Sequence, residues 1–209
     1  MKKAICLLLF LSLLVLASKY TGSDLPENTF SLTFDDGPDE RTLKVLDDLD
    51  KFNIKATFFV VGNMTKGREW IVREEIARGH QVGCHTMTHP LMTKLKKTEW
   101  EKEINDCVKI VTKIIGKKPT LFRFPYGAST IEMEEYAESY GMKVIYWNID
   151  SLDWEKSPEE EIKYIEDGIK NKKKGIILMH DIQKSTEKSL PEILEFLENR
   201  KARFVLLNS

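Results

Sequence analysis

The chain has 209 residues, of which 42% are hydrophobic and 31% are charged, and its formal net charge at pH 7 is −1. These values are typical of a globular domain and exclude a disordered chain or a bundle of membrane helices. Because a nucleic-acid-binding surface needs concentrated positive charge, the near-neutral balance argues against nucleic acid as a partner. At this length we expect a single domain with one site.

The N-terminal residues have the features of a secretory signal. Two lysines precede an apolar run that ends with the small residue Ala17. A membrane-spanning helix needs about 20 apolar residues, so this run is too short to cross a bilayer. We therefore predict that residues 1–17 are a signal peptide, with an uncleaved anchor as the alternative, and that residues 18–29 are a short lead-in. Both alternatives place the domain outside the cytosol.

Short apolar runs with β propensity alternate along the rest of the chain with stretches of helical spacing. They predict seven strands, over 30–34, 56–61, 81–83, 121–124, 143–147, 175–179 and 204–207. The alternation indicates a parallel sheet with helices outside it, and seven repeats indicate incomplete closure compared with an eight-stranded barrel. We expect an α/β fold, a distorted (β/α)7 barrel, over residues 30–207, with an open doubly wound sheet as the alternative.

Two of the intervening helices have recognisable starts. Thr98 with Glu101, and Ser157 with Glu160, match the capping-box pattern, in which a hydroxyl and a carboxylate each accept from the other residue's backbone N–H. Apolar residues over 98–115 recur with the spacing of a helix that packs one face on a sheet. These signals support the prediction of helices between the strands.

Polar residues follow five of the predicted strands, where a βα barrel places its chemistry. The segments are Asp35-Asp36-Gly37-Pro38, Cys84-His85-Thr86-Met87-Thr88-His89, Arg123 with Pro125-Tyr126-Gly127, Asp150-Ser151-Leu152-Asp153-Trp154, and His180-Asp181. Any one of them, taken alone, is also compatible with a simple turn. Three of the four histidines fall on this rim, however, which indicates one site.

Two histidines and one aspartate of this rim form a candidate metal site. His85 and His89 are four positions apart, so on one helical turn both imidazoles would face the same way. A zinc peptidase with a His-Glu-x-x-His motif is disfavoured, because Thr86 occupies the position of its glutamate. With Asp36 added, the ligand set leaves coordination positions open to water and substrate, which favours a catalytic metal.

Five motifs in this order resemble those of the carbohydrate esterase family 4 polysaccharide deacetylases, the NodB-homology domain, over residues 30–207. The motifs are Thr33-Phe34-Asp35-Asp36-Gly37-Pro38, His85-Thr86-Met87-Thr88-His89, Arg123-Phe124-Pro125-Tyr126-Gly127, Asp150-Ser151-Leu152-Asp153-Trp154 and Leu178-Met179-His180. The resemblance implies a secreted, cell-wall-associated hydrolase that removes N-acetyl groups from N-acetylglucosamine units of a polysaccharide. It also implies a divalent metal on Asp36, His85 and His89, with Zn²⁺ expected and Co²⁺ as the alternative.

The resemblance further implies catalytic roles on both sides of the metal. Asp35 would be the catalytic base, oriented by Arg123, and positioned acid or base groups typically contribute roughly 100-fold to 10,000-fold in rate. His180 would be the catalytic acid, tuned by Asp153, because an imidazole exchanges a proton near neutral pH. The backbone N–H of Tyr126 would stabilise the oxyanion.

Substrate contacts are also implied by the resemblance, for Pro125, Tyr126, Trp154 and Leu178. Chitin and peptidoglycan present the same acetamido group, so the motifs do not distinguish them. Our expectation is chitin or its oligomers, with peptidoglycan as the alternative, and a monomer without a stable membrane partner. Two other functions remain open: a catalytically silent wall-glycan-binding homologue, and a two-carboxylate glycosidase, which would leave the rim histidines without a role.

Cys84 and Cys107 are the cysteines that remain outside the predicted signal peptide. Two cysteines make a weak disulfide signal, so pairing and simple burial both stay open. Neighbouring side chains in an extended segment point to opposite faces. We therefore expect Cys84 to point away from His85 into packing, with no catalytic role.

Overall fold

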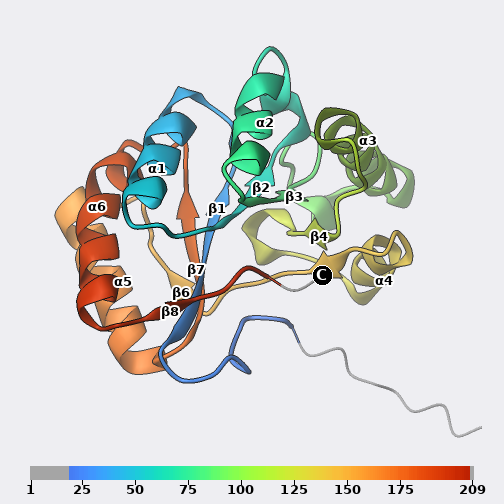
Figure 1. Cartoon of the computed structure of the whole chain (residues 1–209). Coiled ribbons are helices and arrows are strands. Elements are labelled where there is room, and N and C mark those ends of the chain that lie inside the picture. Colours follow the sequence, from blue (N-terminus) through green and yellow to red (C-terminus); the bar gives the residue numbers. More distant parts are fainter. Residues whose placement is uncertain (1–18, 208–209) are drawn as a thin grey trace, which may run out of the picture.

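The computed structural model describes residues 19–207, so the predicted signal peptide over 1–17 lies outside the described residues. Within this range the chain forms a curled sheet of parallel strands with helices packed around its outer face (Figure 1). Neighbouring strands follow the order β5-β4-β3-β2-β1-β7-β6, and β8 pairs with β1. In the part of the chain described, no helix is long and apolar enough to cross a membrane.

The elements alternate along the chain as predicted. The strands are β1 Thr29–Asp35, β2 Thr57–Val60, β3 Gln81–Cys84, β4 Leu121–Phe122, β5 Lys143–Val144, β6 Ile149–Asp150, β7 Gly175–His180 and β8 Arg203–Phe204. The α-helices are α1 Glu40–Lys51, α2 Glu69–Ala77, α3 Lys97–Ile115, α4 Ile131–Ser139, α5 Pro158–Lys172 and α6 Lys184–Asn199, and the 3₁₀ turns are η1 Gly62–Thr65, η2 Met92–Lys94 and η3 Pro125–Gly127. This alternation and the curled parallel sheet confirm the predicted α/β barrel class.

The strand predicted over 143–147 begins at Lys143 as expected but ends at Val144, three residues early, and a second short strand follows at Ile149–Asp150. β5 pairs with β4, whereas β6, which was not predicted, pairs with β7. Between them, the Asn148 side chain accepts from the Ile176 N–H at 3.0 Å and donates to the Lys174 carbonyl at 3.2 Å. These bonds hold the chain at the edge of β7, so the segment bridges the gap between the two ends of the sheet.

The start of α3 also differs from the prediction. The helix begins at Lys97, and the Lys96 N–H donates to the Glu99 carboxylate at 2.8 Å. The predicted capping box of Thr98 with Glu101 is therefore wrong. Because the helix starts one residue before Thr98, Glu99 and not Glu101 occupies the third helical position, from which a carboxylate reaches back to the cap.

The start of α5 agrees with the prediction. The Ser157 N–H donates to the Glu160 carboxylate at 3.0 Å, and the Glu160 N–H donates to the Ser157 hydroxyl at 3.3 Å. Pro158 occupies the first helical position, where its missing N–H removes no hydrogen bond from the helix. This capping box fixes where the first turn of α5 begins, and the next residue, Glu161, is buried against α6.

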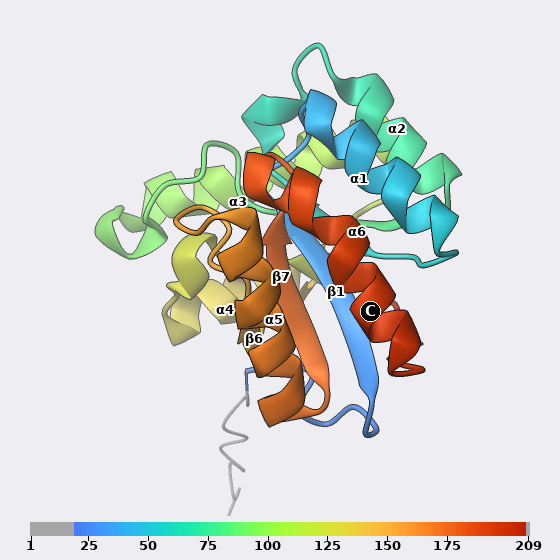
Figure 2. The same cartoon turned by 90° about the vertical axis from the view of Figure 1, so that its left-hand side faces the viewer.

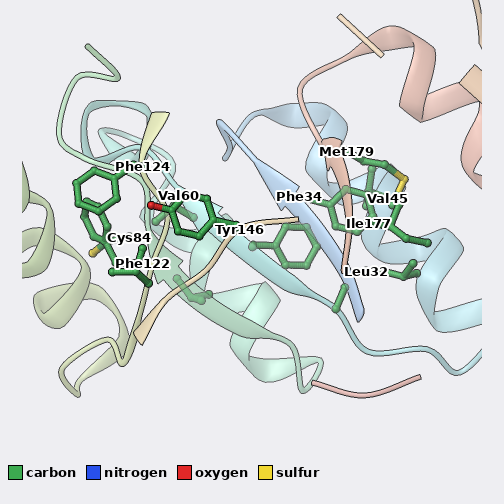
Figure 3. Close-up of a cluster of buried hydrophobic side chains, with 14 of the residues drawn as sticks. Leu32, Phe34, Val45, Val60, Cys84, Phe122, Phe124, Tyr146, Ile177 and Met179 are labelled. Carbon is green, nitrogen blue, oxygen red and sulfur yellow. The ribbon is translucent and has the colours of Figure 1, made fainter. Parts of the chain in front are cut away.

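The two faces of β1 bury residues of opposite character, because successive side chains of a strand point to opposite sides. Leu32 and Phe34 lie between the sheet and the helices, in the same cluster as Val45 of α1 (Figure 3). Thr33 and Asp35 belong to the other face, and both contact an arginine inside the barrel. The alternation thus directs the polar residues of β1 into the barrel, where the site lies.

A small apolar cluster fills the barrel interior beneath these polar residues. Its buried members are Phe59, Leu121, Ile145, Ile176 and Leu207. A Cβ atom on Gly83 would come within 2.8 Å of the Phe59 ring, so glycine at that position lets the ring occupy the interior. The Arg123 guanidinium lies over the same ring, 4.3 Å from its centroid. The cluster therefore forms an apolar floor under the charged groups.

Glu75 of α2 is a buried acid without a compensating partner. Its side chain is fully buried, and neither carboxylate oxygen has a hydrogen-bond partner among the described residues. Burial raises the pKa of Glu75 well above its ordinary value of 4.5, and the nearby charge of Asp181 raises it further. The folded protein therefore holds a proton on Glu75 at a pH where the unfolded chain has released it.

We expect Glu75→Gln to stabilise the protein at pH 8 and to have little effect at pH 5. A raised folded pKa means that stability falls as pH rises above the unfolded pKa, by up to about 1.4 kcal/mol per pH unit until the folded pKa is reached. Glutamine is neutral throughout and avoids this loss. Urea unfolding at both pH values measures the difference, with the exposed Glu135→Gln as control. An equal effect at both pH values would contradict the explanation.

Candidate active site

The loops at the carboxyl ends of the strands surround a cleft of about 580 Å³. The cleft is lined by Asp35, Asp36, His85, His89, Tyr126, Trp147, Asp150, Trp154, Leu178, His180 and Gln183. Three residues to which the sequence assigned roles, Arg123, Pro125 and Asp153, are buried and are not among the lining residues. The structure thus brings the predicted metal, base and acid residues to one cleft.

Asp36, His85 and His89 have the arrangement of a metal-binding group. One ligand atom from each of them lies within 4.8 Å of the other two. Asp36 Oδ1 is 3.5 Å from His85 Nε2 and 3.2 Å from His89 Nε2. This oxygen is buried and has no hydrogen-bond partner among the described residues, so it has an unused lone pair. Two imidazoles and a carboxylate fit a divalent ion that keeps open coordination positions.

His85 presents the correct nitrogen for this purpose. Its Nδ1 lies 2.8 Å from the Arg123 carbonyl oxygen, which accepts a hydrogen bond from it. A proton on Nδ1 leaves the lone pair of Nε2 free to face Asp36. Burial lowers the pKa of His85 to about 3, so the imidazole remains neutral and able to ligate at physiological pH.

The prediction that His85 and His89 share a helical turn is wrong. The segment between them is an irregular loop in which Thr86 and His89 have positive φ angles of 64° and 59°. The Thr86 hydroxyl accepts from the His89 N–H at 3.0 Å, and Glu103 of α3 accepts from two further N–H groups of the loop. These contacts fold the loop back, so that the two imidazole centroids lie 4.9 Å apart.

Asp35 and Asp36 face the same cleft although they are neighbours in sequence. Side chains of consecutive residues in a strand diverge, but Asp36 has a φ of 76° and leaves the extended conformation. As a result His85 Nε2 lies 3.6 Å from Asp35 Oδ2 and 3.5 Å from Asp36 Oδ1. Left-handed backbone at a non-glycine residue is costly and is concentrated at functional sites.

Arg123 is a fully buried cation whose guanidinium group donates several hydrogen bonds. It donates from Nη1 to Asp35 Oδ1 and to the Thr33 hydroxyl, both at 2.8 Å, and from Nη2 to the Tyr146 carbonyl at 3.1 Å. Burial raises the pKa of Asp35, and the charge of Arg123 opposes that increase. The pair therefore holds a carboxylate in a fixed orientation beside the metal-binding group.

His180 at the end of β7 is paired with a buried aspartate. Its Nδ1 lies 2.7 Å from Asp153 Oδ1, and its backbone N–H donates to Asp153 Oδ2 at 2.6 Å. Burial alone would lower the pKa of His180, but the hydrogen bond and charge of Asp153, with Asp35 and Asp36, outweigh it and raise the pKa to about 9. His180 is therefore a protonated imidazole at neutral pH, with Nε2 4.0 Å from Asp36 Oδ2.

Aromatic side chains form the rim of the cleft. Tyr126 is 66% exposed and packs edge-on against His89, and Trp154 is 49% exposed and packs edge-on against His180. Leu178 of β7 is almost completely buried and forms part of the cleft wall. Flat, exposed rings beside a polar cleft offer the apolar faces on which sugar rings can lie.

Three lining residues were missed by the assignments made from sequence: Trp147, Asp150 and Gln183. Trp147 Nε1 donates to Asp150 Oδ2 at 2.9 Å, so these two form one part of the wall. Asp150 opens the fourth motif, and Gln183 follows His180 by three positions, so both stand beside motif residues in the sequence. The sequence positions of Asp150 and Gln183 next to motif residues could have predicted that they line the cleft.

The predicted orientation of Cys84 is confirmed. Cys84 is buried in the cluster between the sheet and the helices, beside Phe122 (Figure 3), and is not among the residues that line the cleft. Cys84 and Cys107 are both buried and form no disulfide in this structure. Neither cysteine contributes to the cleft.

The sequence model of the polysaccharide deacetylase family matches residues 22–145, which is more than half of the chain. This chain belongs to the polysaccharide deacetylase family. The family resemblance seen in the motifs is thereby confirmed, and the matched range includes the motifs that contain Asp35 and Asp36, His85 and His89, and Arg123.

Two curated relatives of this chain are bacterial. A peptidoglycan-N-acetylglucosamine deacetylase, PgdA, from Listeria monocytogenes is 39% identical over 186 residues, which cover 85% of this chain and 38% of that protein. A peptidoglycan-N-acetylmuramic acid deacetylase, PdaC, from Bacillus subtilis is 34% identical over 188 residues, covering 88% of this chain and 39% of that protein. The chain thus spans about two fifths of the length of these relatives.

A solved structure supports the same relationship. The crystal structure of a peptidoglycan N-acetylglucosamine deacetylase bound to an N-hydroxybenzamide compound superposes with a TM-score of 0.84 at 29% sequence identity. The match covers 90% of this chain and 90% of that chain. The curled barrel of this chain is therefore the fold of that structure.

Proposed function

We propose that this polysaccharide deacetylase hydrolyses the N-acetyl group of N-acetylglucosamine units in peptidoglycan and releases acetate. The observation that carries the proposal is the meeting, in one cleft, of a His-His-Asp ligand set, the buried carboxylate Asp35 and the protonated imidazole His180. The relatives named as peptidoglycan deacetylases favour peptidoglycan over the chitin expected from the sequence.

Each group has a task in amide hydrolysis. A divalent ion on the ligand set would lower the pKa of water and polarise the acetyl carbonyl. Asp35, which is held by Arg123, accepts the proton from the attacking water. The backbone N–H of Tyr126 stabilises the charge that develops on the carbonyl oxygen. His180 donates its proton to the departing nitrogen, for which a protonated imidazole is required.

The metal, the location and the assembly state belong to the same proposal. Two imidazoles and one carboxylate at an open site suit Zn²⁺, with Co²⁺ able to replace it. The short apolar run that ends at Ala17 supports export, and the proposed substrate supports association with the cell wall. We propose that the exported protein acts as a monomer, without a stable membrane partner.

We expect purified protein to release acetate from peptidoglycan glycan strands, and to lose this activity when a chelator removes the metal. Adding Zn²⁺ or Co²⁺ should restore it, because Asp36, His85 and His89 remain folded around an empty ligand set. Acetate is measured enzymatically in parallel reactions with peptidoglycan and with N-acetylglucosamine oligomers from chitin.

The outcomes of this experiment separate the alternatives. Acetate from chitin oligomers but not from peptidoglycan would restore the substrate expected from sequence. Activity that survives the chelator would contradict the metal-dependent mechanism. Metal-loaded protein that binds peptidoglycan without releasing acetate would support a catalytically silent binding protein instead.

A further inference from the structure

A buried hydrogen-bond network continues behind His180, on the side away from the cleft. It runs from His180 through Asp153 to Thr186 of α6 and then to Glu161 of α5. These two helices lie side by side on the outside of β7 and β1 (Figure 2). Asp153, Thr186 and Glu161 are all buried, so the network lies within the helix layer. We refer to these four residues as the His180 network.

The distances define the network closely. Asp153 Oδ2 lies 2.5 Å from the Thr186 hydroxyl oxygen, which in turn lies 3.2 Å from Glu161 Oε1. Asp153 also accepts two bonds from His180, one from Nδ1 and one from the backbone N–H. The carboxylate that pairs with the candidate acid is therefore held by a hydroxyl whose other neighbour is a second buried carboxyl group.

The Thr186 hydroxyl has one proton and two carboxyl neighbours. It can donate to Asp153 or to Glu161, but not fully to both. If Glu161 is protonated, it donates to the Thr186 oxygen, and the Thr186 proton is then directed to Asp153. If Glu161 is ionised, the two carboxylates compete for that proton, and a second buried negative charge faces Asp153.

The surroundings of Glu161 favour the protonated form. Burial raises the pKa of Glu161 to about 7, the charge of Asp153 adds to the increase, and hydroxyl groups of α6 oppose it. Those hydroxyls belong to Ser185, Thr186 and Ser189, and Asp153, which precedes α5, is the charged group whose field acts on Glu161. Glu161 Oε2 has no hydrogen-bond partner of ordinary geometry among the described residues, which further disfavours a charge there.

We propose that Glu161 is a positioning residue that donates a hydrogen bond to Thr186, directs the Thr186 hydroxyl to Asp153 and thereby holds the Asp153–His180 pair in the proton-donating arrangement. Glu161 touches neither the cleft nor the metal-binding residues, so it acts through His180 alone. The inference rests on the proposed function of His180 as the acid. It extends the acid motif into α5 and α6, outside the range that the family model matches.

Two substitutions of Glu161 test the donor role directly. Glutamine keeps an N–H donor of similar length, and leucine keeps the volume but cannot donate. We expect Glu161→Gln to retain a kcat close to that of the wild type. We expect Glu161→Leu to lower kcat about 10-fold, the lower end of the range for outer partners that orient site residues, with an unchanged KM. A purely structural role would lower the melting temperature of Glu161→Leu without lowering the kcat of the folded protein.

A second readout needs no substrate. The His180 Nδ1 proton bonded to Asp153 should give a strongly downfield proton NMR signal, which is assigned by its absence in His180→Ala. We expect this signal to persist in metal-loaded wild type and Glu161→Gln, and to broaden or shift in Glu161→Leu. If the wild type shows the signal but releases no acetate, the proposed function fails. The NMR comparison of the Glu161 variants still tests the His180 network in that case.

Thr186→Val provides a matched variant should Glu161→Leu fail to fold. Valine has the shape of threonine but removes the hydroxyl, so it should lower kcat at unchanged KM, and adding Glu161→Gln to it should cause no further loss. The proposal is overturned if folded Glu161→Leu or Thr186→Val keeps the wild-type kcat and NMR signal. It is also overturned if Glu161→Gln loses as much activity as Glu161→Leu. Activity would then require the carboxyl group itself and not a hydrogen bond donated to Thr186.

Discussion

Asp35→Asn should reduce acetate release by roughly 100-fold to 10,000-fold, the usual contribution of a positioned base. Asparagine preserves the shape of the side chain but cannot take up the proton of the attacking water. Metal content should remain that of the wild type, because Asp35 is not part of the ligand set. Acetate-release kinetics and metal analysis of the purified variant measure both effects.

Asp36→Asn is the matched control for Asp35→Asn, since the two aspartates are adjacent and face the same cleft. It should lose metal as well as activity, because Asp36 Oδ1 faces both histidines. Equal metal loss in both variants would argue against separate roles for the two carboxylates. Near-normal acetate release by Asp35→Asn would eliminate Asp35 as the base.

Arg123→Met should lower the free energy of unfolding by about 3–5 kcal/mol, the usual cost of removing one partner of a buried ion pair. The substitution leaves Asp35 buried without its cation and leaves the Thr33 hydroxyl and the Tyr146 carbonyl with one donor fewer. Urea unfolding of the metal-free protein measures the change. Activity should fall as well, because the base loses its orienting bond.

The pH dependence of Arg123→Met identifies the cause. Without the cation, burial should raise the pKa of Asp35 further, so the folded state retains a proton that the unfolded chain releases. The loss of stability should therefore be larger at pH 8 than at pH 4. Adding Asp35→Asn should recover part of the loss, because it removes the unpaired charge. A loss independent of pH and of Asp35 would indicate a packing defect instead.

Much of the site could be predicted from the sequence because of one geometric rule. The carboxyl ends of parallel strands meet at the same end of a barrel, so residues that directly follow separate strands become neighbours. Asp36 follows β1, His85 follows β3 and His180 ends β7, and all three line the cleft. The alternation of β1 similarly places Asp35, and not Phe34, inside the barrel.

Local conformations were less predictable, because they depend on contacts from distant parts of the chain. The loop from His85 to His89 is shaped by Glu103, which lies on α3 and satisfies two of its N–H groups. The break between β5 and β6 depends on the Asn148 side chain reaching β7. No short-range pattern contains these partners, so the predicted helical turn was wrong and the strand predicted over 143–147 was too long.

The sequence by itself determined the fold class and the residues of the candidate site, because strand order and side-chain type are local properties that parallel topology converts into a shared cleft. The tertiary structure alone decided how these residues are held. The Arg123–Asp35 pair, the Nδ1 bond that frees His85 Nε2, and the network from His180 to Glu161 each join separate elements. Burial then sets their charge states, since the pKa of a carboxyl or imidazole responds to desolvation and to neighbouring charges that only the folded chain brings together.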